Sequence, residues 1–175
     1  MGRPALTIFT IGHSTRPIET FVQLLAGHRI ERLVDVRTIP RSRHNPQFNS
    51  EQLADSLRSA AVQYTHLPGL GGLRRPQRDS INTGWRNTGF RGFADYMRTP
   101  AFEDCLRRCI EFSESERIVL MCAEALPWRC HRSLIADALT VRGIEVCEIT
   151  SGVRAKPHVL TPWARVDGTQ ITYAS

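Results

Sequence analysis

The sequence has 175 residues, of which 41% are hydrophobic, so it is long enough to bury the core of one domain without disulfide or metal support. It contains no apolar run near the roughly 20 residues of a membrane-spanning helix, and its first residues lack the pattern of a signal peptide. We therefore expect a cytoplasmic chain with one domain over residues 1–175, no membrane contact and, given its net charge of +6, an anionic partner. Its five cysteines are an odd number and are expected to be reduced thiols.

The first third of the chain alternates between strand and helix patterns. Residues 6–11 are apolar and β-branched, which predicts a buried strand. Pro17 suits the first turn of a helix that ends near Gly27. Further along, the pattern predicts a strand at 32–36, a helix at 49–61 and a strand at 62–66.

A long connection separates this part from the rest. Residues 67–92 are rich in glycine and arginine, and loops of this length are usually functional or disordered. The later elements are a helical turn at 93–97, a helix at 99–112, a strand at 117–122, a helix at 130–142 and a strand at 144–149. The tail from Ser151 has weak strand signals at most. The alternation of strands and helices predicts a three-layer α/β sandwich around a mostly parallel sheet of about five strands.

The positive charge is confined to one region. Of the 23 basic residues, Lys156 alone is not an arginine. Residues 37–98 hold ten arginines against four acidic residues, a net of +6 that equals the charge of the whole chain. Guanidinium groups suit two-pronged contacts with phosphate or carboxylate, so we expect an anionic small molecule or a nucleic acid as partner.

Polar and reactive residues follow the predicted strands. Ligands of an open parallel sheet bind beyond the carboxyl ends of its strands, so this convergence predicts a site there. The candidate site residues are His13, Ser14, Asp35, Arg37, Arg43, His66, Cys122, Glu124, Arg129, His131 and Arg132.

Two carboxylates are candidates for acid–base catalysis. Glu124 follows an apolar strand, where partial burial would raise its pKa into the useful range. Asp35 lies between two valines, where a buried carboxylate must be paired or hydrogen-bonded. The alternative is that each carboxylate only pairs with an arginine, Asp35 with Arg37.

Cys122 and His131 are the other catalytic candidates. The segment from Cys122 to Arg132 resembles, in outline, the anion sites of phosphatases and rhodanese domains, where a thiolate faces a helix N-terminus. Six residues separate Cys122 from Arg129, one more than in phosphatases. Cys122 is therefore alternatively a small apolar residue that ends a buried strand, and His131 alternatively braces the loops at the helix start.

The remaining candidates would bind the substrate. Arg129 and Arg132 stand at the start of a predicted helix, where an anion is favoured. Their alternative role is a salt bridge to Asp35 or Glu124. The other substrate-binding candidates are His13, Ser14, Arg37, Arg43 and His66.

A zinc site is a further alternative for part of this set. Cys122, Cys130 and His131, together with His66 or His13, could hold the ion, but their spacing fits no standard structural zinc pattern. We therefore predict no metal ligands, and the sequence indicates no particular cofactor.

Several ordered motifs carry a family resemblance over residues 7–154. They are Ile11-Gly-His-Ser14, Asp35-Val-Arg37, Pro40-Arg-Ser-Arg43, Asn45-Pro-Gln-Phe48, Tyr64-Thr-His-Leu-Pro68, Leu70-Gly-Gly72, Gly89-Phe-Arg-Gly-Phe93, Leu120-Met-Cys-Ala-Glu124 and Cys130-His-Arg132. Together they resemble the domain-of-unknown-function 488 family. The resemblance implies a bacterial or archaeal intracellular protein and implies no activity.

Three functions follow from these observations. The first is an enzyme, a hydrolase or transferase, that acts on a phosphate-bearing substrate such as a nucleotide or nucleic acid in an arginine-rich pocket. The second is a nucleic-acid-binding module without catalysis, which the charge of residues 37–98 favours. The third is thiol or sulfur-transfer chemistry at Cys122. The sequence does not indicate an oligomeric state.

Overall fold

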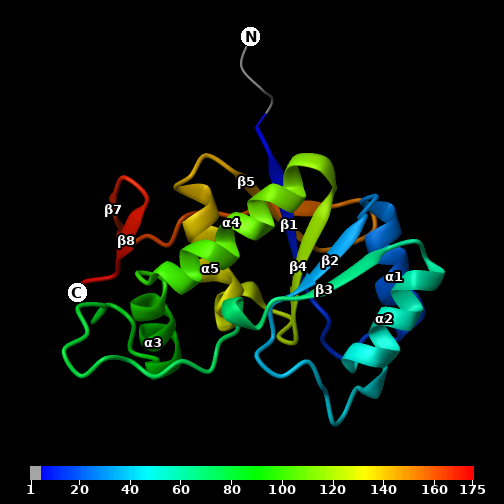
Figure 1. Cartoon of the computed structure of the whole chain (residues 1–175), viewed down its shortest axis with the longest axis horizontal. Helices are drawn as coiled ribbons and strands as arrows, with labels where there is room; N and C mark the ends of the chain where they lie inside the picture. The colour runs from blue at the N-terminus through cyan, green and yellow to red at the C-terminus, as the bar shows by residue number, and fades with distance from the viewer. Residues whose placement is uncertain (1–4) are drawn as a thin grey trace.

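Six strands form one sheet, in the order β3-β2-β4-β1-β5-β6, in a computed structural model that describes residues 5–175 (Figure 1). Its strands are β1 (Thr7–Gly12), β2 (Arg32–Asp35), β3 (Gln63–His66), β4 (Ile118–Cys122), β5 (Glu145–Ile149) and β6 (Ala155–Pro157). The first five run parallel, and β6 pairs antiparallel with β5 at one edge. The predicted mostly parallel sheet is confirmed, with one antiparallel strand added.

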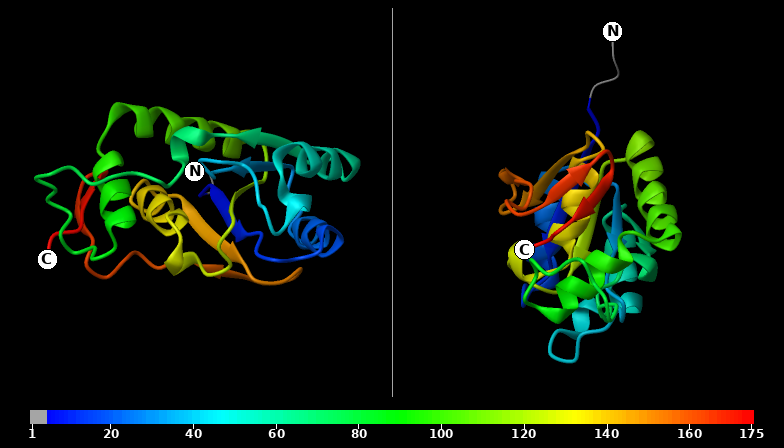
Figure 2. Two further views of the ribbon diagram at one scale, coloured as in Figure 1. Left: turned by 90° about the horizontal axis from the view of Figure 1, so that it is seen from below. Right: turned by 90° about the vertical axis from the view of Figure 1, so that its left-hand side faces the viewer.

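Helices cover both faces of this sheet. They are α1 (Ile18–Gly27), α2 (Ser50–Ser59), α3 (Thr88–Tyr96), α4 (Pro100–Ser115) and α5 (Arg132–Thr140), with short 3₁₀ turns η1 (Pro46–Phe48), η2 (Pro68–Leu70) and η3 (Pro127–Arg129). In Figure 1, α1 and α2 lie together on the right, and α4 and α5 lie on the other side of the strands. Figure 2 shows the same arrangement from below and from the side.

The alternation of side chains along the strands creates these layers. Along β1, Ile8 faces a core cluster built with α3, α4 and α5, while Phe9 and Ile11 face a second cluster built with α1 and α2. Successive residues of a strand point to opposite faces, so a strand that is apolar throughout must be covered on both sides. The prediction of a three-layer α/β sandwich is confirmed.

The connection predicted over residues 67–92 is shorter in the structure, and hydrogen bonds hold it in place. The helical turn expected at 93–97 is a full helix, α3, which begins at Thr88 inside the expected loop. Asn87 caps it by accepting a hydrogen bond from the backbone N–H of Phe90 at 3.1 Å. The Asp95 carboxylate accepts hydrogen bonds from the backbone of Gln77 and the side chains of Ser80 and Asn82. Glycines in the sequence conceal this helix because they lower its propensity.

The tail also contains more structure than its weak strand signals indicate. Besides β6, it forms a hairpin of β7 (Arg165–Asp167) and β8 (Gln170–Thr172). Each of these strands has three residues, too few to produce a recognisable alternation. No helix within residues 5–175 combines the length and apolarity needed to cross a membrane.

Candidate functional site

A cavity of about 360 Å³ opens at the carboxyl ends of β2 and β4. Its walls come from residues 37–41 after β2, 72–73 after η2, 87–90 at the start of α3, and 122–131 between β4 and α5. Since β2 and β4 are neighbours in the sheet, the segments that follow them emerge side by side. The cavity therefore lies at the edge of the sheet where the sequence predicts a site.

The structure divides the predicted site residues into two groups. Five line the cavity, namely Arg37, Cys122, Glu124, Arg129 and His131. Six lie outside its lining, namely His13, Ser14, Asp35, Arg43, His66 and Arg132. Most of the second group are engaged in interactions within the protein.

Asp35 and Arg37 form a buried, two-pronged ion pair. The Arg37 Nε and Nη2 atoms donate to the two Asp35 carboxylate oxygens at 2.9 and 2.7 Å. The hydroxyl of Tyr64 donates to Asp35 at 2.6 Å, and burial together with this hydrogen bond raises the pKa of Tyr64. Asp35 is fully buried with both oxygens occupied, so its geometry matches the structural alternative of holding Arg37 and leaves no oxygen free to act as a base.

His13 and His66 brace this arginine from two directions. The His13 Nδ1 atom lies 2.8 Å from the carbonyl oxygen of Ser14 and therefore carries the proton, which leaves Nε2 to accept from Arg37 Nη1 at 3.4 Å. Burial and the nearby charge of Arg37 lower the pKa of His13 to about 4, although the Ser14 carbonyl opposes this, so the ring is neutral at pH 7. The Nε2 atom of His66 lies 2.7 Å from the carbonyl oxygen of Arg37.

Arg132 is fully buried and holds the loop that follows β4. Its guanidinium pairs with Glu148 at 2.7 Å and donates to the carbonyl oxygens of Glu124 and Ala125 at 2.6 and 3.0 Å. It also donates to the sulfur of Cys122 at 2.6 Å. The expectation that Arg132 binds an anion or pairs with the carboxylate of Asp35 or Glu124 is wrong, because these internal acceptors already surround its guanidinium.

The same loop depends on a glycine at the end of β1. A Cβ atom on Gly12 would lie 1.8 Å from the carbonyl oxygen of Glu124. Only a residue without a side chain lets the two segments approach this closely. Gly12 and Arg132 together fix the position of the Glu124 backbone at the cavity.

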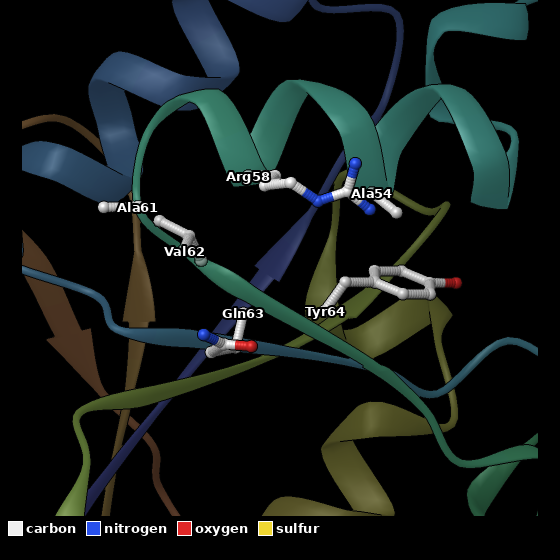
Figure 3. Close-up of a pocket in the computed structure, with 6 residues that line it drawn as sticks. All are labelled: Ala54, Arg58, Ala61, Val62, Gln63 and Tyr64. Atoms are coloured by element: carbon white, nitrogen blue, oxygen red, sulfur yellow. The ribbon is translucent and has the colours of Figure 1, made fainter.

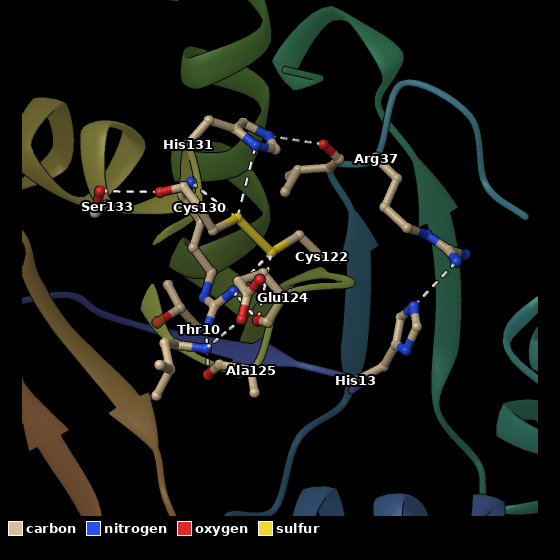
Figure 4. The surroundings of a disulfide bond; sticks show 12 residues. Thr10, His13, Arg37, Cys122, Glu124, Ala125, Cys130, His131 and Ser133 are labelled. Atoms are coloured by element: carbon tan, nitrogen blue, oxygen red, sulfur yellow. Dashed lines mark hydrogen bonds between the residues drawn. A yellow bond between two sulfur atoms is a disulfide. The ribbon is translucent and has the colours of Figure 1, made fainter. Parts of the chain in front are cut away.

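The sulfur atoms of Cys122 and Cys130 lie in contact and are drawn as a disulfide in Figure 4, with their Cα atoms 7.7 Å apart. The expectation of five reduced thiols therefore stays a prediction for this pair, while Cys105, Cys109 and Cys147 are free. The sequence conceals the pairing because eight positions separate the two cysteines, and the fold brings the end of β4 next to the start of α5. Burial raises the pKa of the Cys109 thiol to about 12, so that free cysteine is a core residue.

His131 stands beside the cysteine pair. Its Nε2 atom lies 3.0 Å from the carbonyl oxygen of Val36 and therefore carries the proton of the neutral ring. Its Nδ1 atom lies 3.6 Å from the sulfur of Cys130 (Figure 4). Burial lowers the pKa of His131 to about 4 against the opposing effect of the Val36 and Leu70 carbonyls, so the ring is neutral at pH 7 with a free lone pair on Nδ1.

The charged groups free to meet a ligand are Arg41, Arg129 and Glu124, all exposed and all on the cavity wall. Within residues 5–175, no hydrogen bond or ion pair engages the guanidinium groups of Arg41 and Arg129. Glu124 only accepts a hydrogen bond from the backbone N–H of Leu126 at 3.3 Å. Of the two arginines in this loop, the predicted residue Arg43 is exposed but outside the cavity lining, whereas Arg41, which the sequence pattern does not single out, lies on the wall.

Apolar side chains that sequence reasoning missed complete the wall. They are Ile39, Leu73 and Phe90, of which Leu73 has 78% of its surface exposed. Phe90 stands in one of the motifs that carry the family resemblance, and this motif is the feature of the sequence that could have identified it as a site residue.

A second hollow of about 200 Å³ lies between α2 and β3 (Figure 3). It is lined by Ala54, Arg58, Ala61, Val62, Gln63 and Tyr64. It contains neither a carboxylate nor a thiol, and Arg58 already pairs with Asp55. Across residues 5–175, no three His, Cys, Asp or Glu side chains are grouped so that they could hold a metal ion, and the zinc alternative therefore gains no support.

Comparison with known families gives one match. The model of a family described as Domain of unknown function DUF488 matches residues 17–139, well over half of the chain. Every segment that lines the cavity falls inside this range. No curated protein matches the chain.

Proposed function

Because this chain belongs to the family Domain of unknown function DUF488, whose description names no activity, we propose a function from its own side chains. The protein is a cytoplasmic enzyme that acts on a phosphate-bearing substrate, a nucleotide or a nucleotide unit of a nucleic acid, bound in the cavity at the ends of β2 and β4.

The observation that carries this proposal is the grouping of two unengaged arginines and one carboxylate on a single cavity wall. Arg41 and Arg129 have their guanidinium donors available for phosphate oxygens, which accept such donors in pairs. The guanidinium groups of the two buried arginines are engaged inside the protein: Arg37 pairs with Asp35, and Arg132 pairs with Glu148. Phosphate recognition is therefore assigned to the two exposed arginines.

The size and apolar part of the wall suit the rest of a nucleotide. A volume of about 360 Å³ is at the lower end of the range for small-molecule sites. Phe90, Ile39 and Leu73 offer an aromatic ring and two aliphatic side chains for a base to stack on. One nucleotide, free or at the end of a chain, fits these dimensions better than a duplex.

Glu124 is the acid–base group of the proposed reaction. Its carboxylate is exposed at the cavity, whereas Asp35 is buried beneath Arg37. A carboxylate beside a bound phosphate ester would take a proton from an attacking water or hydroxyl group. Arg132 and Gly12 keep this residue at the wall by fixing its backbone.

Calorimetric titration with inorganic phosphate and nucleoside monophosphates tests the binding step. We expect Arg41→Ala and Arg129→Ala each to weaken binding about 10- to 100-fold, the effect of losing a hydrogen bond to a charged group. Arg43→Ala is the matched control, since Arg43 is exposed in the same loop but lies outside the cavity lining. Equal affinities for all four proteins would contradict the assignment.

A screen of phosphate esters tests the catalytic step. With a substrate found in this way, we expect Glu124→Gln to lower kcat by about 10²- to 10⁴-fold, the usual contribution of an acid–base group. Unchanged turnover in this variant would remove Glu124 from the mechanism.

Binding of nucleic acid without catalysis is the second candidate, and one observation favours it. Seven of the ten arginines in residues 37–98 are exposed, namely Arg41, Arg43, Arg58, Arg75, Arg78, Arg86 and Arg98. Such a module would bind single-stranded DNA or RNA with an affinity that falls steeply with salt. Flat salt dependence, or no binding in low salt, would rule it out.

A further inference from the structure

Two cysteines of the cavity wall lie next to each other, where they could take part in thiol–disulfide exchange. Cys122 and Cys130 both line the cavity, and they are the cysteine pair that the fold brings into contact within residues 5–175. Their Cα atoms lie 7.7 Å apart, beyond the usual separation of about 4.4–6.8 Å in disulfides. A separation above about 7 Å requires a small movement of the backbone when the bond closes, so the fold also admits the open, reduced pair.

The surroundings of Cys122 favour its thiolate form. The Arg132 guanidinium donates to its sulfur at 2.6 Å, and a cation beside a cysteine stabilises the thiolate. Glu148 pairs with the opposite side of the same guanidinium, so part of that charge is balanced. Arg37 and Arg129 also line the cavity, and Glu124 is the carboxylate on its wall.

Two hydrogen-bonding groups lie beside the sulfur of Cys130. Its sulfur accepts a hydrogen bond from the backbone N–H of Arg132 at 3.5 Å, at the N-terminus of the nine-residue helix α5. The Nδ1 atom of neutral His131 lies 3.6 Å away, with its lone pair free because Nε2 donates to Val36. The Nδ1 atom of His131 can therefore accept a hydrogen bond from the Cys130 thiol and orient its sulfur.

We propose that Cys122 and Cys130 are a redox-active pair that exchanges with anionic low-molecular-weight disulfides entering the cavity. The inference does not depend on the phosphate chemistry proposed above and shares with it the cavity and its two exposed arginines. Arg41 and Arg129 supply the preference for an anion. In the cytoplasm, where we place this protein, most disulfides are transient and belong to catalytic or redox-sensing cysteines.

The exchange takes place in two steps. The Cys122 thiolate attacks one sulfur of the disulfide RSSR, forms a Cys122–SR mixed disulfide and releases RS⁻. Cys130 loses its proton to solvent, its sulfur attacks the Cys122 sulfur, and a second RS⁻ leaves. The two RS⁻ groups take up protons, and two electrons have passed from the cysteine pair to RSSR.

Trapping with oxidised glutathione, an anionic disulfide, tests this order of events. Fully reduced protein is exposed to the probe, quenched with acid, alkylated and mapped by mass spectrometry. We expect the wild type to form the Cys122–Cys130 disulfide, and Cys130→Ser to retain glutathione on Cys122. Cys105→Ser is the matched control and should behave as the wild type, since Cys105 is a free, part-exposed cysteine outside the cavity lining.

Two results would overturn the proposal. One is glutathione on Cys105 while Cys122 and Cys130 remain open to alkylation. The other is faster oxidation by cystamine, a cationic disulfide, than by oxidised glutathione, which would remove the anionic substrate class. The first result does not bear on phosphate binding, and phosphate titration of Arg41→Ala and Arg129→Ala tests that binding directly, so the two proposals fail separately.

If the serine variants do not fold, a measurement on the wild-type protein still tests the proposal. At pH 6, we expect Cys122 of the reduced protein to react with iodoacetamide on the order of ten-fold faster than Cys105, because a stabilised thiolate is the reactive form. Cys122 has only 3% of its surface exposed, so burial alone would make it slower. A rate below that of Cys105 would contradict the thiolate assignment.

Discussion

Arg37 and Arg132 show how burial changes the role of a charged residue. Both are arginines at the ends of buried segments, and both have their guanidinium donors occupied by carboxylates and carbonyl oxygens of the protein. From the sequence alone, they look the same as Arg41 and Arg129, which remain unengaged. Composition and spacing predict that arginines gather at this edge, but only the packing decides which of them face solvent.

The Asp35–Arg37 pair gives a prediction about stability. We expect Asp35→Asn to lower the free energy of unfolding by about 3 kcal/mol or more, because it leaves a buried guanidinium without its counter-charge. Asp55→Asn is the control, since its pair with Arg58 is exposed on both sides and should contribute less than about 1 kcal/mol. Urea denaturation of the three proteins measures both values, and equal effects would contradict the structural role of Asp35.

The two neutral histidines give a prediction about pH. The pKa values of His13 and His131 are about 4 in the folded protein, below the usual histidine value of 6.5. The unfolded chain therefore binds more protons between these values, and stability falls as the pH drops from 6.5 to 4. The loss amounts to at most about 3 kcal/mol for each histidine.

Urea denaturation at pH 7 and at pH 4.5 measures this loss. His131→Gln should show a smaller decrease in stability between the two pH values than the wild type. His44→Gln, at an exposed position, should show the same decrease as the wild type. A decrease in His131→Gln as large as that of the wild type would show that another group causes the acid sensitivity.

At the scale of elements, strands long enough to show a pattern were predictable and short or glycine-rich elements were not. The apolar runs of β1 and β4 are visible in the sequence because a strand buried on both faces is apolar throughout. Helix α3 carries two glycines, and β6, β7 and β8 have three residues each, so local pattern says little about them. These elements form because the rest of the fold gives them partners.

The contact between β1 and the loop after β4 gives a prediction at this scale. We expect Gly12→Ala to destabilise the protein by about 1–3 kcal/mol and to weaken ligand binding, because its Cβ would meet the Glu124 carbonyl oxygen and displace the cavity wall. Gly152→Ala is the control, because a Cβ there meets nothing within 4 Å. Thermal denaturation and phosphate titration provide the two measurements, and normal binding by Gly12→Ala would show that the wall tolerates the shift.

At the scale of the whole molecule, the family match and the folding unit differ in extent. The match covers residues 17–139, yet β1 lies between β4 and β5 in the sheet and precedes that range. Buried Asp137 of α5 receives its hydrogen bonds from His158, Thr161 and Tyr173, all beyond it. The sequence predicted β1 and β5 correctly but gave no sign that the tail completes the environment of α5.

Truncation tests this dependence on the flanking segments. We expect a fragment of residues 17–139 to be unfolded, because it lacks the strand at the centre of the sheet and leaves the Asp137 carboxylate without partners. Circular dichroism and amide-proton dispersion in NMR would show this directly. A cooperatively folded fragment would contradict it and would define a smaller domain.

The anchoring of the connection before α3 by Asp95 affects the thermodynamics of any binding at the cavity. Because Asp95 already holds residues 77–82 in place and Asn87 starts α3, the wall that contains Phe90 is ordered before a ligand arrives. A pre-organised wall loses little conformational entropy on association. Binding should therefore show a small change in heat capacity, limited to the apolar surface that the ligand itself covers, rather than the large change of coupled folding and binding.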